Sequence, residues 1–143
     1  LRFWDIDSSV VKVSVPGGGK ALTAMCISDA SCVVGCADGA VRLLDGRDGK
    51  GVVAVSVKGK GHAGIVSDVT WLDTDATMAS GGLDGAVRVW DMRAFGTPVH
   101  TVNQVHGKNA RSLALCSGMV DKKQLLLSAG EDGHVQRIEF VKG

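Results

Sequence analysis

The stretch "ASGGLDGAVRVWDMR" (residues 79–93) contains a tight-turn signal between two runs of small and apolar residues. Asp84-Gly85 is that signal, because a type I′ hairpin turn needs positive φ angles, which glycine adopts at low cost. We therefore expect "ATMASG" (76–81) and "AVRVWD" (86–91) to form neighbouring antiparallel strands joined at this dipeptide.

The same phrase occurs elsewhere in the chain. "ADGAVRLLD" (37–45) repeats it, "EDGHVQRIEF" (131–140) is a variant of it, and "LRFWD" (1–5) matches its second half. The corresponding pentads begin 40, 46 and 48 residues apart, which is typical of a repeat architecture. The segment 113–133 aligns with its counterparts only if four extra residues, 121–124, form a polar loop.

Each repeat unit predicts four short strands. In the central unit, "IVSDVTWL" (65–72) forms a strand before the hairpin, with 74–76 as a polar turn. Weaker apolar stretches follow the pentads at 10–15, 51–57 and 98–105. A four-stranded sheet that is apolar on both faces has to stack against copies of itself. We therefore predict an all-β fold of four-stranded antiparallel blades around an axis, a β-propeller.

The central unit resembles the WD-repeat β-propeller family. "GH" (61–62), Ser80, Asp84 and Trp90 stand where that family keeps its His, Ser or Thr, Asp and Trp. The resemblance implies that His62 and the other three side chains form a buried hydrogen-bond relay between strands. It also implies that the chain is a partial propeller, a piece of a ring of about seven blades.

The other two units keep only part of this set. The last unit has His106, Ser128 and Asp132, with Ile138 at the tryptophan position. The first unit keeps Asp38 alone of the four. We therefore expect apolar packing to hold the first blade, and we expect that blade to be the loosest of the three.

The repeat boundaries divide a single domain, residues 1–143. It comprises the end of one blade (1–15), two blades (21–57 and 62–105) and a last blade without its outer strand (106–143). The thirteen expected strands do not close even a small propeller. We therefore expect a C-terminal part of a longer protein, completed by its own N-terminal remainder or by another chain.

The composition argues against several classes of partner. The net charge is +1 with acids and bases interspersed, so the one-signed stripe of a nucleic-acid-binding surface is missing. No apolar run approaches the roughly 20 residues of a membrane span. The four cysteines lie in apolar stretches without metal-ligand spacing, which predicts small buried thiols and an intracellular, cytoplasmic or nuclear location. We expect no nucleic acid, membrane, metal or cofactor.

Two patterns could indicate chemistry, and both have a simpler interpretation. His62, Ser80 and Asp84 form a Ser-His-Asp set, but the serine lies inside a predicted strand and no oxyanion-hole loop accompanies it. "VPGGGKAL" (15–22) and "VKGKGHAG" (57–64) contain Gly-Lys turns without the Ser or Thr of a phosphate-binding loop. We assign no catalytic residue, and an enzyme or nucleotide-binding module that uses these turns is the alternative from another class.

We expect a non-enzymatic protein-interaction scaffold within a larger complex of proteins. Its partners are other, unidentified proteins. The residues before the turn aspartates are candidates for a binding surface, because the resemblance places this position near the top face of a propeller. They are Ala37, Leu83 and Glu131.

A second resemblance concerns docking to a ubiquitin ligase. Residues 78–93 are similar to the box with which WD-repeat proteins dock onto the β-propeller adaptor of cullin-type ligases. In that resemblance Asp91 and Arg93 carry the docking. A substrate receptor of a cullin-type ligase is therefore the alternative function.

Overall fold

The computed structural model describes residues 2–14, 19–28, 31–45, 51–72 and 76–139. Two sequence predictions, the turn at 74–76 and the Gly-Lys turn at 15–22, lie partly outside the described residues. The regular structure is β-strand apart from one 3-10 turn, η1 (Met92–Ala94). The strands are β1 (Arg2–Asp5), β2 (Val10–Ser14), β3 (Leu22–Ser28), β4 (Ser31–Cys36), β5 (Val41–Asp45), β6 (Gly51–Val55), β7 (Val66–Leu72), β8 (Thr77–Gly82), β9 (Val87–Asp91), β10 (His100–Val102), β11 (Ser112–Val120), β12 (Lys123–Gly130) and β13 (Val135–Ile138).

These strands form four antiparallel sheets in which each strand pairs with its neighbours in the chain. β1 and β2 form a hairpin, β3–β6 and β7–β10 form four-stranded sheets, and β11–β13 form a three-stranded sheet. The predicted all-β fold with four-stranded antiparallel blades is therefore confirmed. Among the described residues, no helix has the length and hydrophobicity that crossing a membrane requires.

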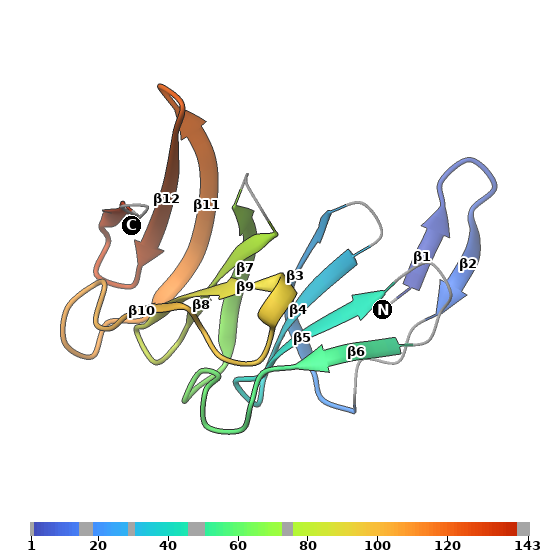
Figure 1. Ribbon diagram of the computed structural model, residues 1–143, viewed down its shortest axis with the longest axis horizontal. Coiled ribbons are helices and arrows are strands. Elements are labelled where there is room, and N and C mark those ends of the chain that lie inside the picture. Colours follow the sequence, from blue (N-terminus) through green and yellow to red (C-terminus); the bar gives the residue numbers. More distant parts are fainter. Residues whose placement is uncertain (1, 15–18, 29–30, 46–50, 73–75, 140–143) are drawn as a thin grey trace.

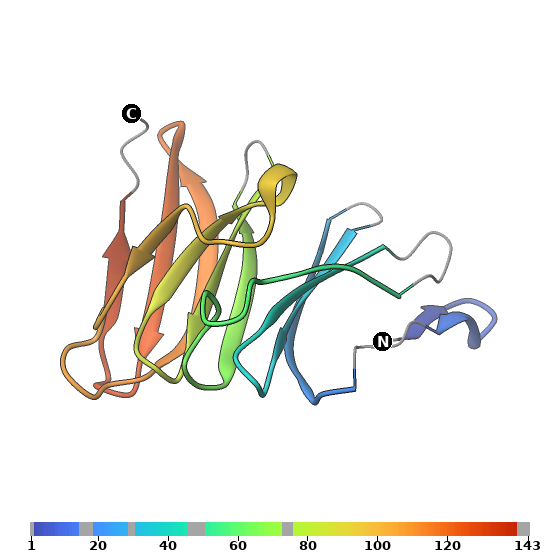
Figure 2. The same ribbon diagram turned by 60° about the horizontal axis from the view of Figure 1, so that its bottom comes forward.

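The three larger sheets stand side by side, with the β1–β2 hairpin set apart at the N-terminal end (Figures 1 and 2). Strand β7, the first of its sheet, contacts β3 on one side and β11 on the other. The turns β4–β5, β8–β9 and β12–β13 lie at the lower edge in both views, together with the loops that precede β7 and β11. These turns and loops together form the loop face.

Apolar side chains fill the spaces between neighbouring sheets. One cluster joins Val33 and Val41 of the β3–β6 sheet to Val66 and Trp90 of the β7–β10 sheet. A second cluster draws on the β7–β10 and β11–β13 sheets. Its buried members are Leu72, Ala79, Val87, Val89, Leu115, Leu126 and Ile138. Each sheet therefore buries its face against the next one, as stacked repeats must.

The Asp-Gly hairpins are present, but the predicted type I′ geometry is wrong. A type I′ turn needs positive φ at both central residues, whereas among the described turn residues only the glycine has one, with φ = 77° at Gly85. The Gly85 N–H donates to the Gly82 carbonyl, and the Gly82 N–H donates to the Ala86 carbonyl. The connection is thus a three-residue loop, a type I turn followed by a left-handed glycine. Gly39 and Gly133 repeat it.

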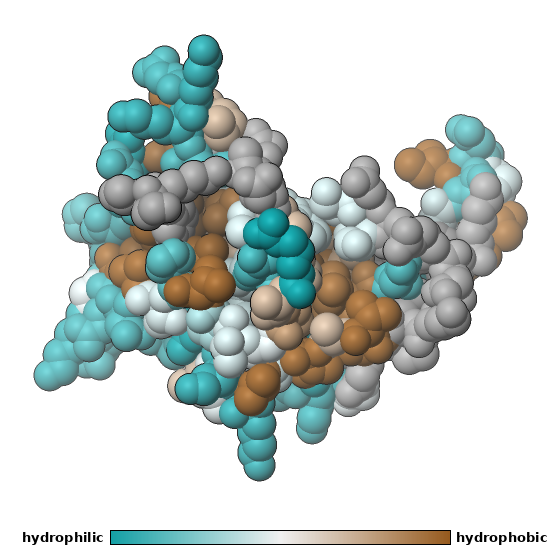
Figure 3. Space-filling view, in the orientation of Figure 1, coloured by the Kyte–Doolittle hydropathy of each residue, from teal (hydrophilic) through white to brown (hydrophobic). Residues whose placement is uncertain are grey.

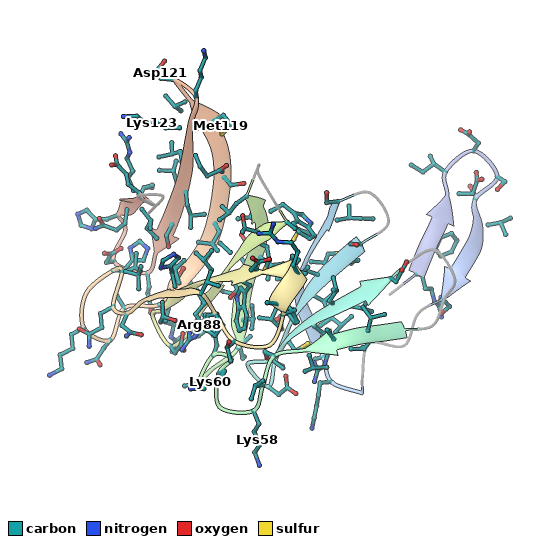
Figure 4. The ribbon with its side chains drawn as sticks, in the orientation of Figure 1. Lys58, Lys60, Arg88, Met119, Asp121 and Lys123 are labelled. Atoms are coloured by element: carbon teal, nitrogen blue, oxygen red, sulfur yellow. The ribbon has the colours of Figure 1, made fainter. Side chains whose placement is uncertain are left out.

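The polar loop expected at 121–124 is also wrong. Lys123 and Gln124 belong to strand β12, and Val120 pairs directly with Lys123. Asp121 and Lys122, both with positive φ, form the two-residue turn between them. The inserted residues therefore lengthen the β11–β12 hairpin, which projects beyond the neighbouring strands (Figures 1 and 4).

The two end sheets expose apolar side chains on their outward faces. Met25, Ile27 and Val53 of the β3–β6 sheet are each more than half exposed, and Val135 of β13 is 64% exposed. Figure 3 shows hydrophobic surface gathered over the β5–β6 side of the molecule. Exposed apolar faces and strand edges favour pairing with further chain segments.

Residues 1–143 expressed alone are therefore expected to self-associate. Light scattering during size-exclusion chromatography measures this directly, and dimers or larger species are the expected result. A sharp monomer peak with cooperative thermal unfolding would contradict the expectation that these faces need a partner.

Candidate functional site

The polar centre of the β7–β10 sheet is a chain of four side chains, of which three are buried and Asp84 is half-buried. His62, in the loop before β7, contacts Asp84 Oδ1 through Nδ1 at 2.9 Å and Ser80 Oγ through Nε2 at 2.8 Å. The indole N–H of Trp90 donates to the same Ser80 oxygen at 2.9 Å. Ser80 and Trp90 are fully buried. The structure thus brings together the four residues assigned to the relay of this blade.

Donor chemistry fixes one end of this chain. The Trp90 indole can only donate, so Ser80 Oγ accepts there. A serine oxygen can accept twice and donate once, so Ser80 can either donate to His62 Nε2 or accept from it. Arg88 Nη1 also lies 2.7 Å from His62 Nδ1, the ring nitrogen that contacts Asp84. The contacts of the relay therefore run from indole to hydroxyl to imidazole to carboxylate.

Further groups hold the Asp84 carboxylate. Its oxygens accept the backbone N–H groups of Ala63 at 2.9 Å and Ala86 at 3.2 Å. Arg88, which the sequence interpretation missed, lies 3.0 Å from Asp84 Oδ2. Burial raises the pKa of Asp84, but hydrogen bonds from the His62 ring and the backbone lower it more, so the net pKa lies well below its usual value. The carboxylate stays charged where it anchors the turn.

The last blade builds a similar chain without tryptophan. His106 contacts Asp132 Oδ1 at 3.0 Å and Ser128 Oγ at 2.8 Å. Ser112, which is fully buried, makes a further contact with Ser128 Oγ at 2.9 Å, and either hydroxyl can be the donor. Ile138 occupies the tryptophan position within an apolar cluster.

The first blade satisfies its turn aspartate in another way. Asp38 pairs with Arg42 at 2.8 Å, and the other terminal nitrogen of Arg42 donates to the Cys36 sulfur. This ion pair adds to the apolar packing that was expected to hold the first blade. Apolar packing contributes through a buried cluster of Cys32, Val34, Cys36 and Leu44. Arg42 and Arg88 both lie four residues after the turn aspartate, and this spacing is the sequence signal that could have revealed them.

A glycine leaves the space that each relay histidine ring occupies. A Cβ on Gly82 would overlap the His62 ring, and a Cβ on Gly130 would overlap the His106 ring. The equivalent residue of the first blade is Cys36, and the sequence before that blade has no histidine. Its side chain is buried beside Arg42. Histidine and glycine therefore occur together, and where the histidine is missing a side chain takes its place.

Polar side chains also join neighbouring sheets, and the sequence interpretation did not identify them. Ser67 Oγ donates to the Ser112 carbonyl at 2.5 Å, and the Leu115 N–H donates to Asp68 Oδ2 at 2.7 Å. Thr23 Oγ1 similarly donates to the Val66 carbonyl at 2.6 Å. These bonds connect β3 to β7 and β7 to β11, so the first strands of the blades are held together by hydrogen bonds as well as by packing.

The three candidates for a binding surface take equivalent places on the loop face. The backbone N–H groups of Ala37, Leu83 and Glu131 each donate to a carbonyl just before the first strand of their own sheet. Ala37 and Glu131 are exposed and Leu83 is half-buried. Glu131 also pairs with Arg111 at 3.5 Å.

Asp91 and Arg93 lie together at the start of η1. Asp91 accepts the Arg93 backbone N–H at 2.9 Å and pairs with two nitrogens of the Arg93 guanidinium at 3.0 and 2.9 Å. The Arg93 side chain is 67% exposed. The two residues therefore form one surface unit, in which Asp91 holds the guanidinium.

The cysteines differ from the predicted small buried thiols. Cys32 and Cys36 are buried and Cys26 is half-buried, but Cys116 is exposed, so the prediction is wrong for that residue. Burial, with smaller contributions from Cys32 and Asp68, raises the pKa of Cys26 to about 12. Within the described segments, no group of three or more His, Cys, Asp or Glu side chains is arranged to hold a metal ion.

Repeated antiparallel sheets, stacked face to face and held by a turn aspartate and a buried imidazole, are the blades of a β-propeller. Residues 54–91, which span the His62 loop and end at Asp91, match the family "WD domain, G-beta repeat". The chain thus carries a WD repeat, and its fold is that of the WD-repeat propellers.

Three comparisons define what the chain is similar to. The ribosome biogenesis protein WDR12 homolog of Trichoplax adhaerens is 27% identical over 139 residues, which is 95% of this chain and 31% of that protein. The WDR12 homolog of Chlamydomonas reinhardtii is 35% identical over 101 residues, 65% of this chain and 22% of that protein. A chain in the crystal structure of the mitotic checkpoint complex superposes with a TM-score of 0.74 at 21% identity, covering 88% of this chain and 36% of its own length. This chain therefore spans about a third or less of the curated relatives it matches.

The relay predicts unequal costs for removing its two histidines. His62→Ala should lower the free energy of unfolding by roughly 1–3 kcal/mol, because it leaves half-buried Asp84 and buried Ser80 short of a partner. His106→Ala should cost less, because Asp132 is more exposed than Asp84 and water can replace the lost donor. Chemical denaturation of the full-length variants measures both values, and equal, negligible losses would contradict the relay.

The close approach of glycine and imidazole predicts a second loss of stability. Gly82→Ala should destabilise the fold by about 1–3 kcal/mol, because the new methyl group has to displace the His62 ring. Gly118→Ala in β11 is the matched control, since a Cβ there meets no atom within 4 Å. Similar unfolding midpoints for both variants would show that the imidazole does not occupy this space.

Proposed function

We propose that this chain is part of a WD-repeat propeller that acts as a non-enzymatic protein-interaction scaffold in a multiprotein complex. The burial of its Ser-His-Asp set carries the proposal. Ser80 is fully buried and accepts the Trp90 indole, so a substrate carbonyl has no route to its oxygen. The residues that most resemble a catalytic triad therefore hold strands together.

The surface supports the same proposal. The sheets stand side by side, and their turns and loops lie together on the loop face. Binding residues often lie on loops of this kind, because loops tolerate sequence changes while the strands beneath them keep their geometry. Ala37, Leu83 and Glu131 are proposed contact positions on this face.

The names of the relatives suggest a first setting for the scaffold. Two of them are ribosome biogenesis proteins, which supports a role within an assembly complex of the nucleus or nucleolus. The partners contacted there are proteins, held through the loop face and through the outward faces of the end sheets.

Affinity purification of the tagged full-length protein tests this proposal. Protein partners should co-purify in stoichiometric amounts and should remain after treatment with ribonuclease, because the contacts are between proteins. Fluorescence imaging of the tagged protein should show nuclear or nucleolar signal. A protein that retains no partner, or that loses every partner with ribonuclease, would contradict the scaffold proposal.

The ubiquitin-ligase alternative depends on Arg93. The geometry favours a preformed surface group, because Asp91 already holds the guanidinium at the rim of the β7–β10 sheet. An adaptor carboxylate would therefore meet an oriented cation, which reduces the ordering cost of binding. The same pairing means that Asp91 and Arg93 would dock as a unit.

Arg93→Ala should leave the melting temperature nearly unchanged, because the side chain is mostly exposed. In a complex with a cullin adaptor, the loss should be on the order of 2 kcal/mol, as for arginine at interface hot spots. A pull-down of the adaptor with the full-length protein measures it. Arg137→Ala, an exposed arginine paired with Glu139, is the matched control. If the wild type retains no adaptor, or both variants retain as much, the ligase alternative is excluded and the scaffold proposal stands.

A further inference from the structure

A pocket of about 260 Å³ opens on the loop face beside the outer strand of the β3–β6 sheet. Its walls come from the β4–β5 turn and the start of β5, from the end of β6 with the segment after it, and from the "KGKG" loop at 58–61. Lys58 and Lys60 belong to this loop and lie at the lower edge of the molecule in Figure 4. The relay does not use the pocket, although Asp38 and His62 form part of its lining.

An insertion in one loop creates this pocket. Val55 pairs with Arg42, and Thr101 pairs with the equivalent Arg88, so the two outer strands can be aligned. The segment from Val55 to His62 is therefore two residues longer than the equivalent segment from Thr101 to His106. The extra length is taken up by a turn in which the Lys60 N–H donates to the Val57 carbonyl and Gly59 has φ = 79°.

The charged groups around the pocket give it an excess of positive charge. Arg42 is neutralised by Asp38, the carboxylate in the lining. Lys58 and Lys60 are exposed, and within the described residues no carboxylate lies within 4.0 Å of either.

Ser56 adds a buried donor at the wall. Its Oγ accepts the Val41 N–H at 3.2 Å, and the described residues offer no acceptor for its hydroxyl hydrogen. The side chain belongs to the pocket lining, and the residue is 7% exposed. An incoming acceptor would therefore meet the Ser56 hydroxyl donor within the pocket, and Lys58 of the lining and Lys60 of the same loop add positive charge nearby.

The size and composition of the pocket select the kind of anion. Its volume of about 260 Å³ lies just below the roughly 300–1,000 Å³ of sites for drug-sized ligands, which suits a single side chain better than a nucleotide. The ring in the described lining is the His62 imidazole, and its side chain is fully buried, so a nucleobase cannot stack on it. Val55 and Val57 add an apolar wall that suits the methylene groups of a glutamate side chain.

We propose that this pocket binds a carboxylate side chain in an acidic segment of a partner protein, with Ser56 and Lys58 as the contacting donors and Lys60 as an attracting charge. The proposal rests on the scaffold function above and adds the chemistry of one partner. It also gives the Gly-Lys turn at 57–64 a role that requires no nucleotide.

Fluorescence anisotropy with a labelled peptide of alternating glutamate and glycine tests the proposal on the full-length protein. Lys58→Gln/Lys60→Gln should weaken binding about tenfold or more, and Ser56→Ala should weaken it by a smaller factor. Lys20→Gln/Lys108→Gln is the matched control, because it removes two exposed charges from neighbouring loops. It should change the affinity by about twofold or less. Equal melting temperatures of the two double variants verify that both are folded.

Four results would overturn the proposal. They are equal weakening by the two double variants, equal affinity for the glutamine version of the peptide, tighter binding of oligouridylate than of the peptide, and no binding by the wild type. Partners that co-purify with a protein that binds no acidic peptide would refute the pocket alone. Loss of all protein partners would refute the scaffold function itself.

Discussion

The need to satisfy the polar groups around each hairpin turn shapes the blades of this protein. A carboxylate, an imidazole and a hydroxyl that are withdrawn from water would each destabilise the fold without hydrogen-bond partners. In the β7–β10 sheet they satisfy one another, from the Trp90 indole through Ser80 and His62 to Asp84. The chain of bonds reaches from strand β9 to the loop before β7, so it holds the turn, the second strand and the loop in one geometry.

The three blades show how far that requirement can vary. Where tryptophan is missing, Ser112 supplies the hydroxyl that contacts Ser128. Where histidine is missing, Arg42 crosses to Asp38 and Cys36 fills the space that the imidazole takes elsewhere. In each case the turn aspartate has a charged or polar partner, which offsets the cost of removing its carboxylate from water.

The alternation of apolar residues and the Asp-Gly turn signals were sufficient to predict the strands from the sequence. They were insufficient for the turn geometry and for contacts that depend on neighbouring segments. Asp84-Gly85 correctly indicated a hairpin, but the same dipeptide suits both the type I′ turn and the observed three-residue loop, and only the backbone distinguishes them. The role of Ser112 depends on a contact with another strand, which no repeat alignment contains. Arg42 lies on a strand that also reads as apolar. The exposed Cys116 lies in an apolar run, because the outward face of an end sheet has the same pattern as a buried one.

The four side chains of the relay are expected to act as one unit, and a double-mutant cycle between its ends measures this. His62→Ala removes the imidazole, and Trp90→Phe keeps an aromatic ring while removing the indole N–H. The two residues are linked through Ser80 Oγ, which both of them contact. A coupling free energy of about 1 kcal/mol or more is expected in the unfolding of the full-length protein. Losses that add to within about 0.3–0.5 kcal/mol would show that the relay is not a unit.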